Sequence, residues 1–304
     1  MPNDKFDKMQ EVYWDWKVKT SKKGFWDVYA NFVEYIDKFV LICYNQNMKD
    51  YIFEDKIEIL DDNAQVIFID YDSSDTLKEM LDKHFVAICR GEKSLDDIKS
   101  IKLEIKDYLA NKKHFQKIGA VAEFFAHLYF INKGFKQECM FLNLEEASAK
   151  KGFDGVYSKD NKILLLESKS RNFSKNVNHK ANIRVAYNDL CDKFSGKSKK
   201  GIKNNPWRNA YNHASHKDVN SSTRLQEELR NLSNEYQQKT YKDISFFNII
   251  PCSTIIDESK KDENSKKKLI EKIKKLIFTL KYKSIIAVAI SNRIYDFFLK
   301  YLED

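Results

Sequence analysis

Glycine and proline are scarce in this chain of 304 residues, which contains eight Gly and three Pro. Flexible linkers are usually rich in Gly, Ser or Pro, so the sequence leaves little room for a long one. The length exceeds the size at which one hydrophobic core usually stops growing. We therefore expect one large domain or two smaller ones that follow each other closely.

Cysteine pairs, long apolar runs and internal repeats are also missing. The cysteines are odd in number and scattered, with no spacing that suits zinc or a disulfide framework: Cys43, Cys89, Cys139, Cys191 and Cys252. No apolar run approaches the length that spans a membrane, and the opening residues MPNDKFDK lack the apolar core of a signal peptide. We expect a cytoplasmic protein with reduced, mostly buried thiols and no membrane contact.

Positive charge is in moderate excess. Lys and Arg number 53 and Asp and Glu number 45, which gives a net charge of +8. Such a balance favours polyanionic partners, but a compositional bias toward Lys and Asn would produce it as well. Charge alone therefore does not establish a nucleic-acid partner.

The first part of the chain, residues 1–110, reads as a mixed α/β region that is a candidate for binding a partner protein. Its hydrophobic periodicity predicts a helix at 26–46, a buried strand at 64–71, a second strand at 84–91, and an amphipathic helix at 94–110 with Ser94 as its N-cap.

Residues 111–304 show a clearer alternation of elements. A strongly apolar helix follows Lys113 and ends at Gly134. Strands are predicted at 136–144, 153–158 and 162–170, and then a helix at 178–194. The last elements are a strand at 244–256, a basic helix at 265–283, a strand at 284–291 covered on both faces, and a helix at 293–302. Pro251 places the strand at 244–256 at an edge or a bend.

Acidic and basic side chains interrupt the apolar strands at 153–158 and 162–170. Successive side chains of a strand point to opposite faces, so Glu167 and Lys169 share one face and Ser168 takes the other. Asp154 lies on the preceding strand, and a short turn would bring it beside Glu167. The hairpin thus gathers two carboxylates and one ammonium group.

This set suits the hydrolysis of a phosphodiester. Asp154 and Glu167, with the backbone carbonyl of Ser168, could hold Mg²⁺ or Mn²⁺, which would polarise the phosphate and activate a water. Lys169 could orient that water, help to deprotonate it, or neutralise developing charge.

Glu123 is a further candidate, because it is the only acid between Ile118 and Ile131. Its neighbours on a helical wheel include Gly119, Ala120 and Ala126, so this face can approach a sheet closely. Burying a carboxylate is costly unless a metal or a partner compensates it. Glu123 could bind a second metal or a metal-bound water; alternatively it is a partly exposed helix residue.

The order helix with Glu123, strand, strand with Asp154-Gly155, and strand with Glu167-Ser168-Lys169 resembles the PD-(D/E)XK nuclease superfamily, although Phe153 stands where that motif often has Pro. The resemblance implies an α/β fold with a restriction-endonuclease-like core in residues 111–304 and an N-terminal α+β region. A narrower likeness, carried by GFDGVYS, LLLESKS, NPWRNAYNHA and IIPCSTII, is to the HamA nucleases of Hachiman antiphage systems. It implies DNA as substrate and a helicase subunit, HamB, as partner.

The segment GKSKKGIKNNPWR could lie along a nucleic-acid backbone, or it could be a solvated basic loop. The candidate contacts are Lys197, Lys199, Lys200, Lys203, Arg208 and Trp207, the last by stacking on a base. The fragment SGKS lacks the first Gly and the preceding strand of a phosphate-binding loop, which excludes ATP binding there.

The residues therefore predict a Mg²⁺-dependent phosphodiester hydrolase, and the resemblance implies that it is a deoxyribonuclease acting in antiphage defence with a helicase. Two alternatives stay open: a nucleic-acid-binding or scaffolding subunit without activity, and a stand-alone restriction endonuclease. For the hairpin itself, the alternative to a catalytic site is a surface turn with a cross-strand ion pair, which contributes little.

Overall fold

The computed structural model describes residues 53–71, 75–142, 152–197 and 205–304. They belong to one compact unit that begins at Ile52, so the division expected after residue 110 falls inside this unit. The helix predicted at 26–46 lies outside the described residues. No helix in the described ranges is long and apolar enough to cross a membrane.

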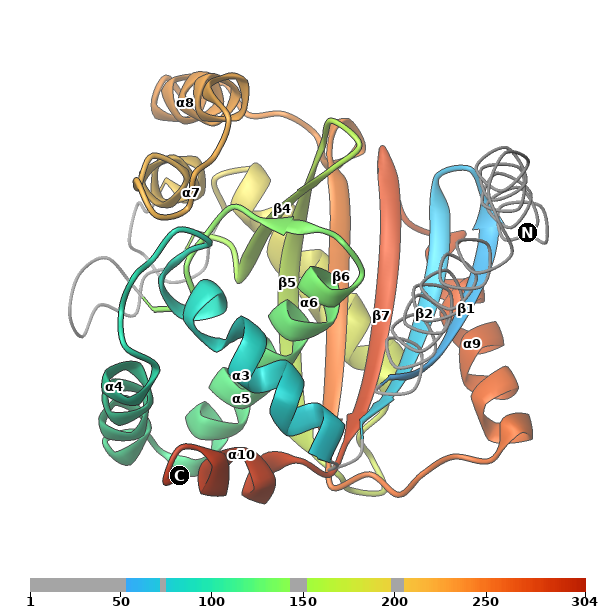
Figure 1. The fold of residues 1–304 in the computed structure, drawn as a ribbon. Coiled ribbons are helices and arrows are strands. Elements are labelled where there is room, and N and C mark those ends of the chain that lie inside the picture. Colours follow the sequence, from blue (N-terminus) through green and yellow to red (C-terminus); the bar gives the residue numbers. More distant parts are fainter. Residues whose placement is uncertain (1–52, 72–74, 143–151, 198–204) are drawn as a thin grey trace, which may run out of the picture. The chain divides into compact units, whose positions relative to one another are not determined.

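A seven-stranded mixed sheet in the order β1-β2-β7-β6-β5-β4-β3 forms the centre (Figure 1). Its four middle strands β2, β7, β6 and β5 are parallel, and β1, β4 and β3 join antiparallel at the two sides. The strands are β1 (Glu54–Asp61), β2 (Ala64–Tyr71), β3 (Lys136–Gln137), β4 (Gly155–Lys159), β5 (Lys162–Asn172), β6 (Asn248–Ile256) and β7 (Ser284–Asn292).

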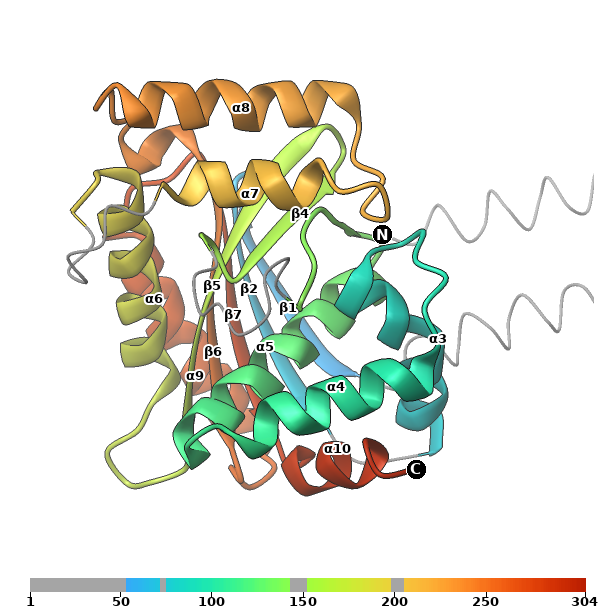
Figure 2. The ribbon, with the colours of Figure 1, turned by 90° about the vertical axis from the view of Figure 1, so that its left-hand side faces the viewer.

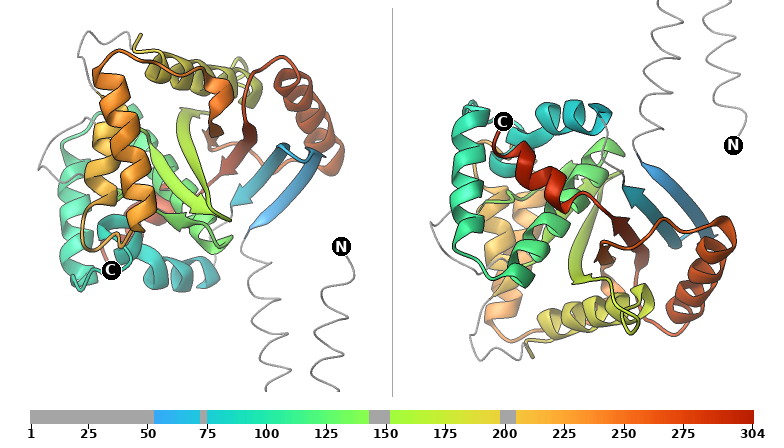
Figure 3. Two further views of the ribbon diagram at one scale, coloured as in Figure 1. Left: turned by 90° about the horizontal axis from the view of Figure 1, so that it is seen from above. Right: turned by 90° about the horizontal axis from the view of Figure 1, so that it is seen from below.

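Helices cover both faces of the sheet, which gives an α/β fold (Figure 2). One face carries α3 (Asp75–Arg90), α4 (Ile98–Ala110), α5 (His114–Asn132) and α10 (Tyr295–Tyr301). The other carries α6 (His179–Phe194) and α9 (Glu263–Ile277), and α7 (Pro206–Ala214) joins the same core. Views from above and below show α7 beside α8 (Thr223–Gln237), which precedes the short 3-10 helix η1 (Ile244–Phe246) (Figure 3).

The sheet divides the apolar residues into two cores. In β5, Leu164 and Leu166 pack with α5, whereas Leu165 packs with α6. The same alternation runs along β7, which lies between β2 and β6 as a strand covered on both faces should. These two predictions, the buried strand β7 and the faces of β5, are confirmed.

Turn chemistry fixes the β4–β5 hairpin. Asp160 and Asn161 have φ angles of 50° and 59°, the left-handed pair that a tight two-residue hairpin turn requires. Gly134, with φ of 78°, ends α5 as predicted. The hairpin sets β4 and β5 in a register in which Gly155 is opposite Leu166.

Two predictions in the first part are wrong in detail. Residues 84–91 do not form a strand but end α3, whose buried residues recur at helical spacing: Leu77, Leu81, Phe85 and Ile88. The N-cap of α4 is Asp97, whose side chain accepts a hydrogen bond from the Ser100 N–H, and not Ser94. Ser94 lies in the preceding turn, where its hydroxyl accepts from the Asp96 N–H.

Two strand predictions also need correction. The described part of the strand predicted at 136–144 ends at residue 142, and in it only Lys136 and Gln137 form a strand, because Phe141 and Leu142 donate instead to carbonyls at the end of α3. Of the two alternatives for the strand that contains Pro251, the edge position is wrong: β6 lies between β5 and β7 and is buried throughout. The pairing of β6 with β7 skips Ile250 and Pro251, so the missing N–H of Pro251 falls in an interruption of that ladder.

Candidate active site

Asp154 directly precedes β4 and extends the hairpin through its side chain. Its N–H donates to the Leu166 carbonyl at 3.1 Å, and its Oδ2 accepts the Ser168 N–H at 2.8 Å. The Asp154 carboxylate thus accepts the hydrogen bond from Ser168 that a backbone carbonyl would accept if β4 extended further along β5. Since the N–H and C=O of a strand residue point to the same neighbour, the Ser168 carbonyl also faces the Asp154 side.

Glu167 is buried on the α6 face of β5, and two ammonium groups contact it. Lys169 Nζ donates to Oε1 at 2.8 Å, and Lys193 Nζ donates to Oε2. Lys169 also contacts Asp189 Oδ2 at 2.8 Å. The structure therefore brings Glu167 and Lys169 together on one face.

Asp189 and Lys193 are site residues that sequence reasoning missed. Both lie on α6, four residues apart and hence on one side of the helix. This spacing was a visible signal, but the sequence does not say which strand the helix crosses. The packing of α6 against β5 and β6 supplies that information.

Glu123 reaches the site from the opposite face of the sheet, on α5. Helix and strand come close at Gly119, where an added Cβ would lie 3.8 Å from Ser170 Oγ. Glu123 Oε1 is 3.9 Å from Nε2 of the buried His127, whose Nδ1 is 2.6 Å from the Tyr157 hydroxyl on β4. The half-buried Glu123 is close enough for its charge to act on Asp154.

Burial, the charge of Glu167 and the charge of Glu123 raise the pKa of Asp154 to about 7, against the opposing effects of Lys193 and Lys169. For Lys169, burial favours the neutral form, but the charges of Glu167 and Asp154 and hydrogen bonds to Asp189 and Glu167 outweigh it and raise the pKa. The charges of Glu167 and Asp154 and a hydrogen bond to Glu167 also raise the pKa of Lys193, against the opposing effects of burial and of Lys169. Both lysines are cations at neutral pH.

This electrostatic balance bears on metal binding. Within the described parts of the chain, no three His, Cys, Asp or Glu side chains gather closely enough to hold an ion. Mg²⁺ needs fewer, since it is commonly held by one or two carboxylates together with waters and substrate phosphates. Asp154 and Glu167 meet that requirement, and burial together with the charges of Glu167 and Glu123 raises the pKa of Asp154, so a cation bound beside this carboxylate would favour its ionised form. The donor set fits a hard divalent cation.

The structure describes three of the six predicted nucleic-acid contacts. Trp207 is buried, with its ring centroid 5.0 Å from those of Phe153 and Phe247, so the prediction that it stacks on a base is wrong. The indole holds α7 against the sheet. Lys197 and Arg208 are exposed, while Lys199, Lys200 and Lys203 lie outside the described residues.

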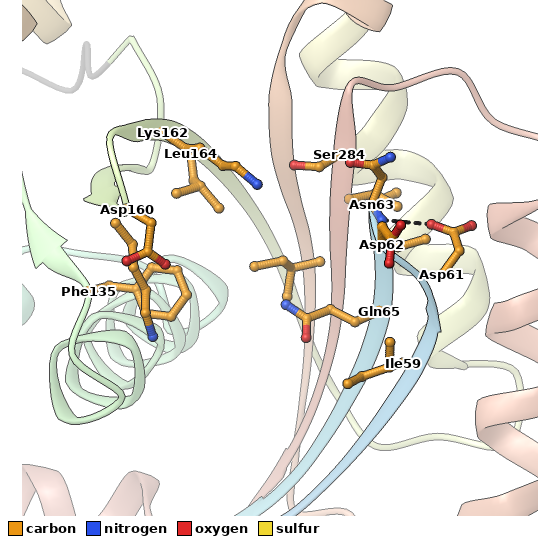
Figure 4. A pocket seen from close by; sticks show the side chains of 14 residues that line it. Ile59, Asp61, Asp62, Asn63, Gln65, Phe135, Asp160, Lys162, Leu164 and Ser284 are labelled. Atoms are coloured by element: carbon orange, nitrogen blue, oxygen red, sulfur yellow. Dashed lines mark hydrogen bonds between the residues drawn. The ribbon is translucent and has the colours of Figure 1, made fainter. Parts of the chain in front are cut away.

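A separate pocket of about 310 Å³ lies at the other end of the hairpin (Figure 4). Asp160 and Lys162 of the hairpin turn line it on one side, and Asp61 and Asn63 of the β1–β2 turn on the other. Its lining includes none of Asp154, Glu167, Lys169 and Lys193, which we call the acid–lysine cluster.

No protein-family model matches this chain, and no curated protein is similar enough to count as a relative. The family expected from the sequence therefore stays a prediction.

Proposed function

We propose that the protein is a Mg²⁺- or Mn²⁺-dependent nuclease that hydrolyses DNA phosphodiester bonds on a restriction-endonuclease-like core. The observation that carries the proposal is the convergence of Asp154, Glu167 and Lys169 on one hairpin, with Glu123 in electrostatic reach. A surface ion pair would not need a third acid from another helix, nor a buried Glu167. Strand β5 of the hairpin pairs in parallel with β6, and α5 and α6 cover opposite faces of the sheet. This arrangement supports a restriction-endonuclease-like core.

Asp154 and Glu167 would hold the metal ion, with the Ser168 carbonyl facing the same side. When bound, the ion supplies Lewis acidity toward the phosphate and lowers the pKa of a coordinated water. Glu167 is at present satisfied by Lys169 and Lys193, so binding requires it to exchange at least one ammonium contact.

Lys169 acts through its charge in this mechanism. Its raised pKa keeps it protonated at neutral pH, so it orients the attacking water and stabilises negative charge that develops on the phosphate. Removing a proton from the water then falls to another group. Glu123 is the acid best placed to accept this proton. It lies on the opposite face of the sheet from Lys193, so neither lysine that binds Glu167 occupies its side of the sheet.

Cleavage of plasmid, linear duplex, single-stranded DNA and RNA, each with Mg²⁺, Mn²⁺ or EDTA, tests the proposal. Wild-type protein should cut DNA only with a divalent ion. Asp154→Asn should not cut, and Lys169→Ala should cut far more slowly than the wild type. Cleavage that continues in EDTA, or in Asp154→Asn, would exclude this site. Lys272→Ala, at an exposed lysine of α9 that belongs neither to the acid and lysine side chains of the site nor to the candidate nucleic-acid contacts, is the matched control.

One observation favours a second candidate, a nucleic-acid-binding or scaffolding subunit without activity: both Glu167 oxygens are already bound by lysines. Such a subunit would bind DNA equally well with and without Mg²⁺ and would never cut it. A restriction enzyme would instead show sequence-specific fragments.

The likeness to HamA extends the proposal to a cytoplasmic defence nuclease that works with a helicase subunit. A purified chain of this kind should cut weakly by itself. Affinity purification from the native host should recover a helicase, and a fully active monomer with no partner would contradict this extension.

A further inference from the structure

Two segments without acidic residues meet beside the candidate active site. One begins α5 with the sequence KKHFQKI, and the other ends β5 with SRNFSKNV. Asn172 Nδ2 and His114 Nε2 are 3.3 Å apart, which joins the two segments directly. Each segment exposes one phenylalanine: Phe115 is 68% exposed and Phe173 is 50% exposed.

The arrangement of α5 and β5 directs both segments toward the catalytic residues. Phe115, Gly119 and Glu123 recur every four residues and so form one row along α5, about 12 Å long. On β5, Arg171 continues the face of Glu167 and Lys169, and Phe173 follows the end of the strand. The two rows start from acids on opposite faces of the sheet, Glu123 and Glu167, and their far ends come together where His114 contacts Asn172.

The flank of β5 between these rows is open in the described structure. β4 pairs only with residues Lys162–Leu166, and only the Asp154 side chain extends this pairing to Ser168. A polymer that follows this flank would pass Glu167 and Lys169 and then reach Arg171 and the two phenylalanines.

The chemistry of this surface distinguishes single strands from duplexes. One exposed Phe is ordinary, but two on contacting segments that also carry cations are the combination that binds unpaired bases by stacking and the backbone by charge. A duplex hides its base faces and could use only the cations. We propose that Phe115 and Phe173, with Lys113, Lys117, Arg171 and Lys175, bind a single strand of nucleic acid and lead it to the active site.

This inference rests on the proposed function for its meaning, but binding can be measured independently of cleavage. The assay is fluorescence anisotropy of the full chain with a labelled oligothymidylate in EDTA. Phe115→Ala and Phe173→Ala should each weaken binding about 5- to 100-fold. Lys113→Ala and Lys175→Ala should each reduce the slope of log K against log salt by about 0.7.

Matched controls come from two other exposed phenylalanines. Phe246 is 65% exposed and Phe278 is 62% exposed, and they lie before β6 and β7, at the ends of the parallel strands opposite to the one that Phe173 follows. Phe246→Ala and Phe278→Ala should bind like the wild type. All four variants should melt at the wild-type temperature, because the side chains are exposed.

Further arms compare an oligoribonucleotide and a duplex of the same sequence. Tighter binding of either single strand than of the duplex supports the inference, and the two single strands together tell DNA from RNA. Duplex binding as tight as single-strand binding overturns it, as do unchanged Phe115→Ala and Phe173→Ala variants. A protein that binds single strands through these residues but cuts nothing would refute the proposed function and leave the inference standing.

Discussion

Replacing Asp154 by Asn should stabilise the metal-free protein at alkaline pH, whereas replacing Glu167 by Gln should destabilise it. The pKa of Asp154 is raised from 3.8 to about 7, by burial and by the charges of Glu167 and Glu123. One pKa unit corresponds to about 1.4 kcal/mol. The rise therefore sets an upper limit of about 4 kcal/mol on the extra free energy needed to ionise Asp154 in the folded state compared with the unfolded state. Because the carboxylate keeps some contact with solvent, we expect a gain of about 1–2 kcal/mol for Asn.

The pH dependence gives this prediction its sign. Asp154 binds its proton more tightly in the folded than in the unfolded protein, so wild-type stability should fall as pH rises from about 4 to about 7 and then level off. The advantage of Asp154→Asn should therefore be absent near pH 4 and complete by pH 8. The amide oxygen of Asn can still accept the Ser168 N–H, so the hairpin stays intact.

Glu167 has the opposite environment, because two lysines depend on it. Its replacement by Gln leaves the ammonium groups of Lys169 and Lys193 without their shared partner, a loss of about 3–5 kcal/mol for a buried pair. Thermal melting in EDTA at pH 4 and at pH 8, with urea unfolding at each, measures both effects. Shifts in the same direction for the two variants, or a pH-independent effect of Asn, would refute the electrostatic reasoning.

Other predictions concern the lysines and the buried indole. Lys169→Ala should reduce cleavage about 10²- to 10³-fold while nucleic-acid and Mg²⁺ binding persist, and Lys169→Arg should rescue poorly; equal loss of binding and cleavage would make Lys169 a phosphate anchor instead. Lys193→Met should tighten Mg²⁺ binding in calorimetry, because one competitor for Glu167 is gone; weaker binding would contradict that role. Trp207→Ala should lower the unfolding free energy by about 3–5 kcal/mol, and if it weakened binding of nucleic acid to the fully folded protein, our placement of the indole would be wrong.

Much of the fold could be predicted because local signals and tertiary packing agree. The run SIIAVAIS has no polar face, so it had to lie inside a covered sheet, and Asp160-Asn161 is a turn by its own chemistry. Residues 84–91 were wrongly predicted as a strand because a short apolar run suits a strand or a helix equally. Only the wider recurrence from Leu77 onward shows that they belong to α3.

The site was predictable to the extent that it is local. Strand alternation put Glu167 and Lys169 on one face, and the short hairpin placed Asp154 beside them. Asp189 and Lys193 come from a helix whose crossing point over β5 depends on packing, which no local pattern specifies. Trp207 was misassigned because an aromatic among lysines looks like a nucleic-acid contact until its burial is known.

The hydrogen bond from the Ser168 N–H to the Asp154 carboxylate gives Asp154 a structural role that does not depend on catalysis. A lineage released from selection for cleavage would still need an acceptor at this point of the ladder, because leaving that N–H unpaired costs about 1–3 kcal/mol. Asn and Asp satisfy it, and Ala does not. Homologues without activity should therefore keep Asp or Asn at position 154, so an acid or amide at this position is no sign by itself that a homologue cleaves nucleic acid.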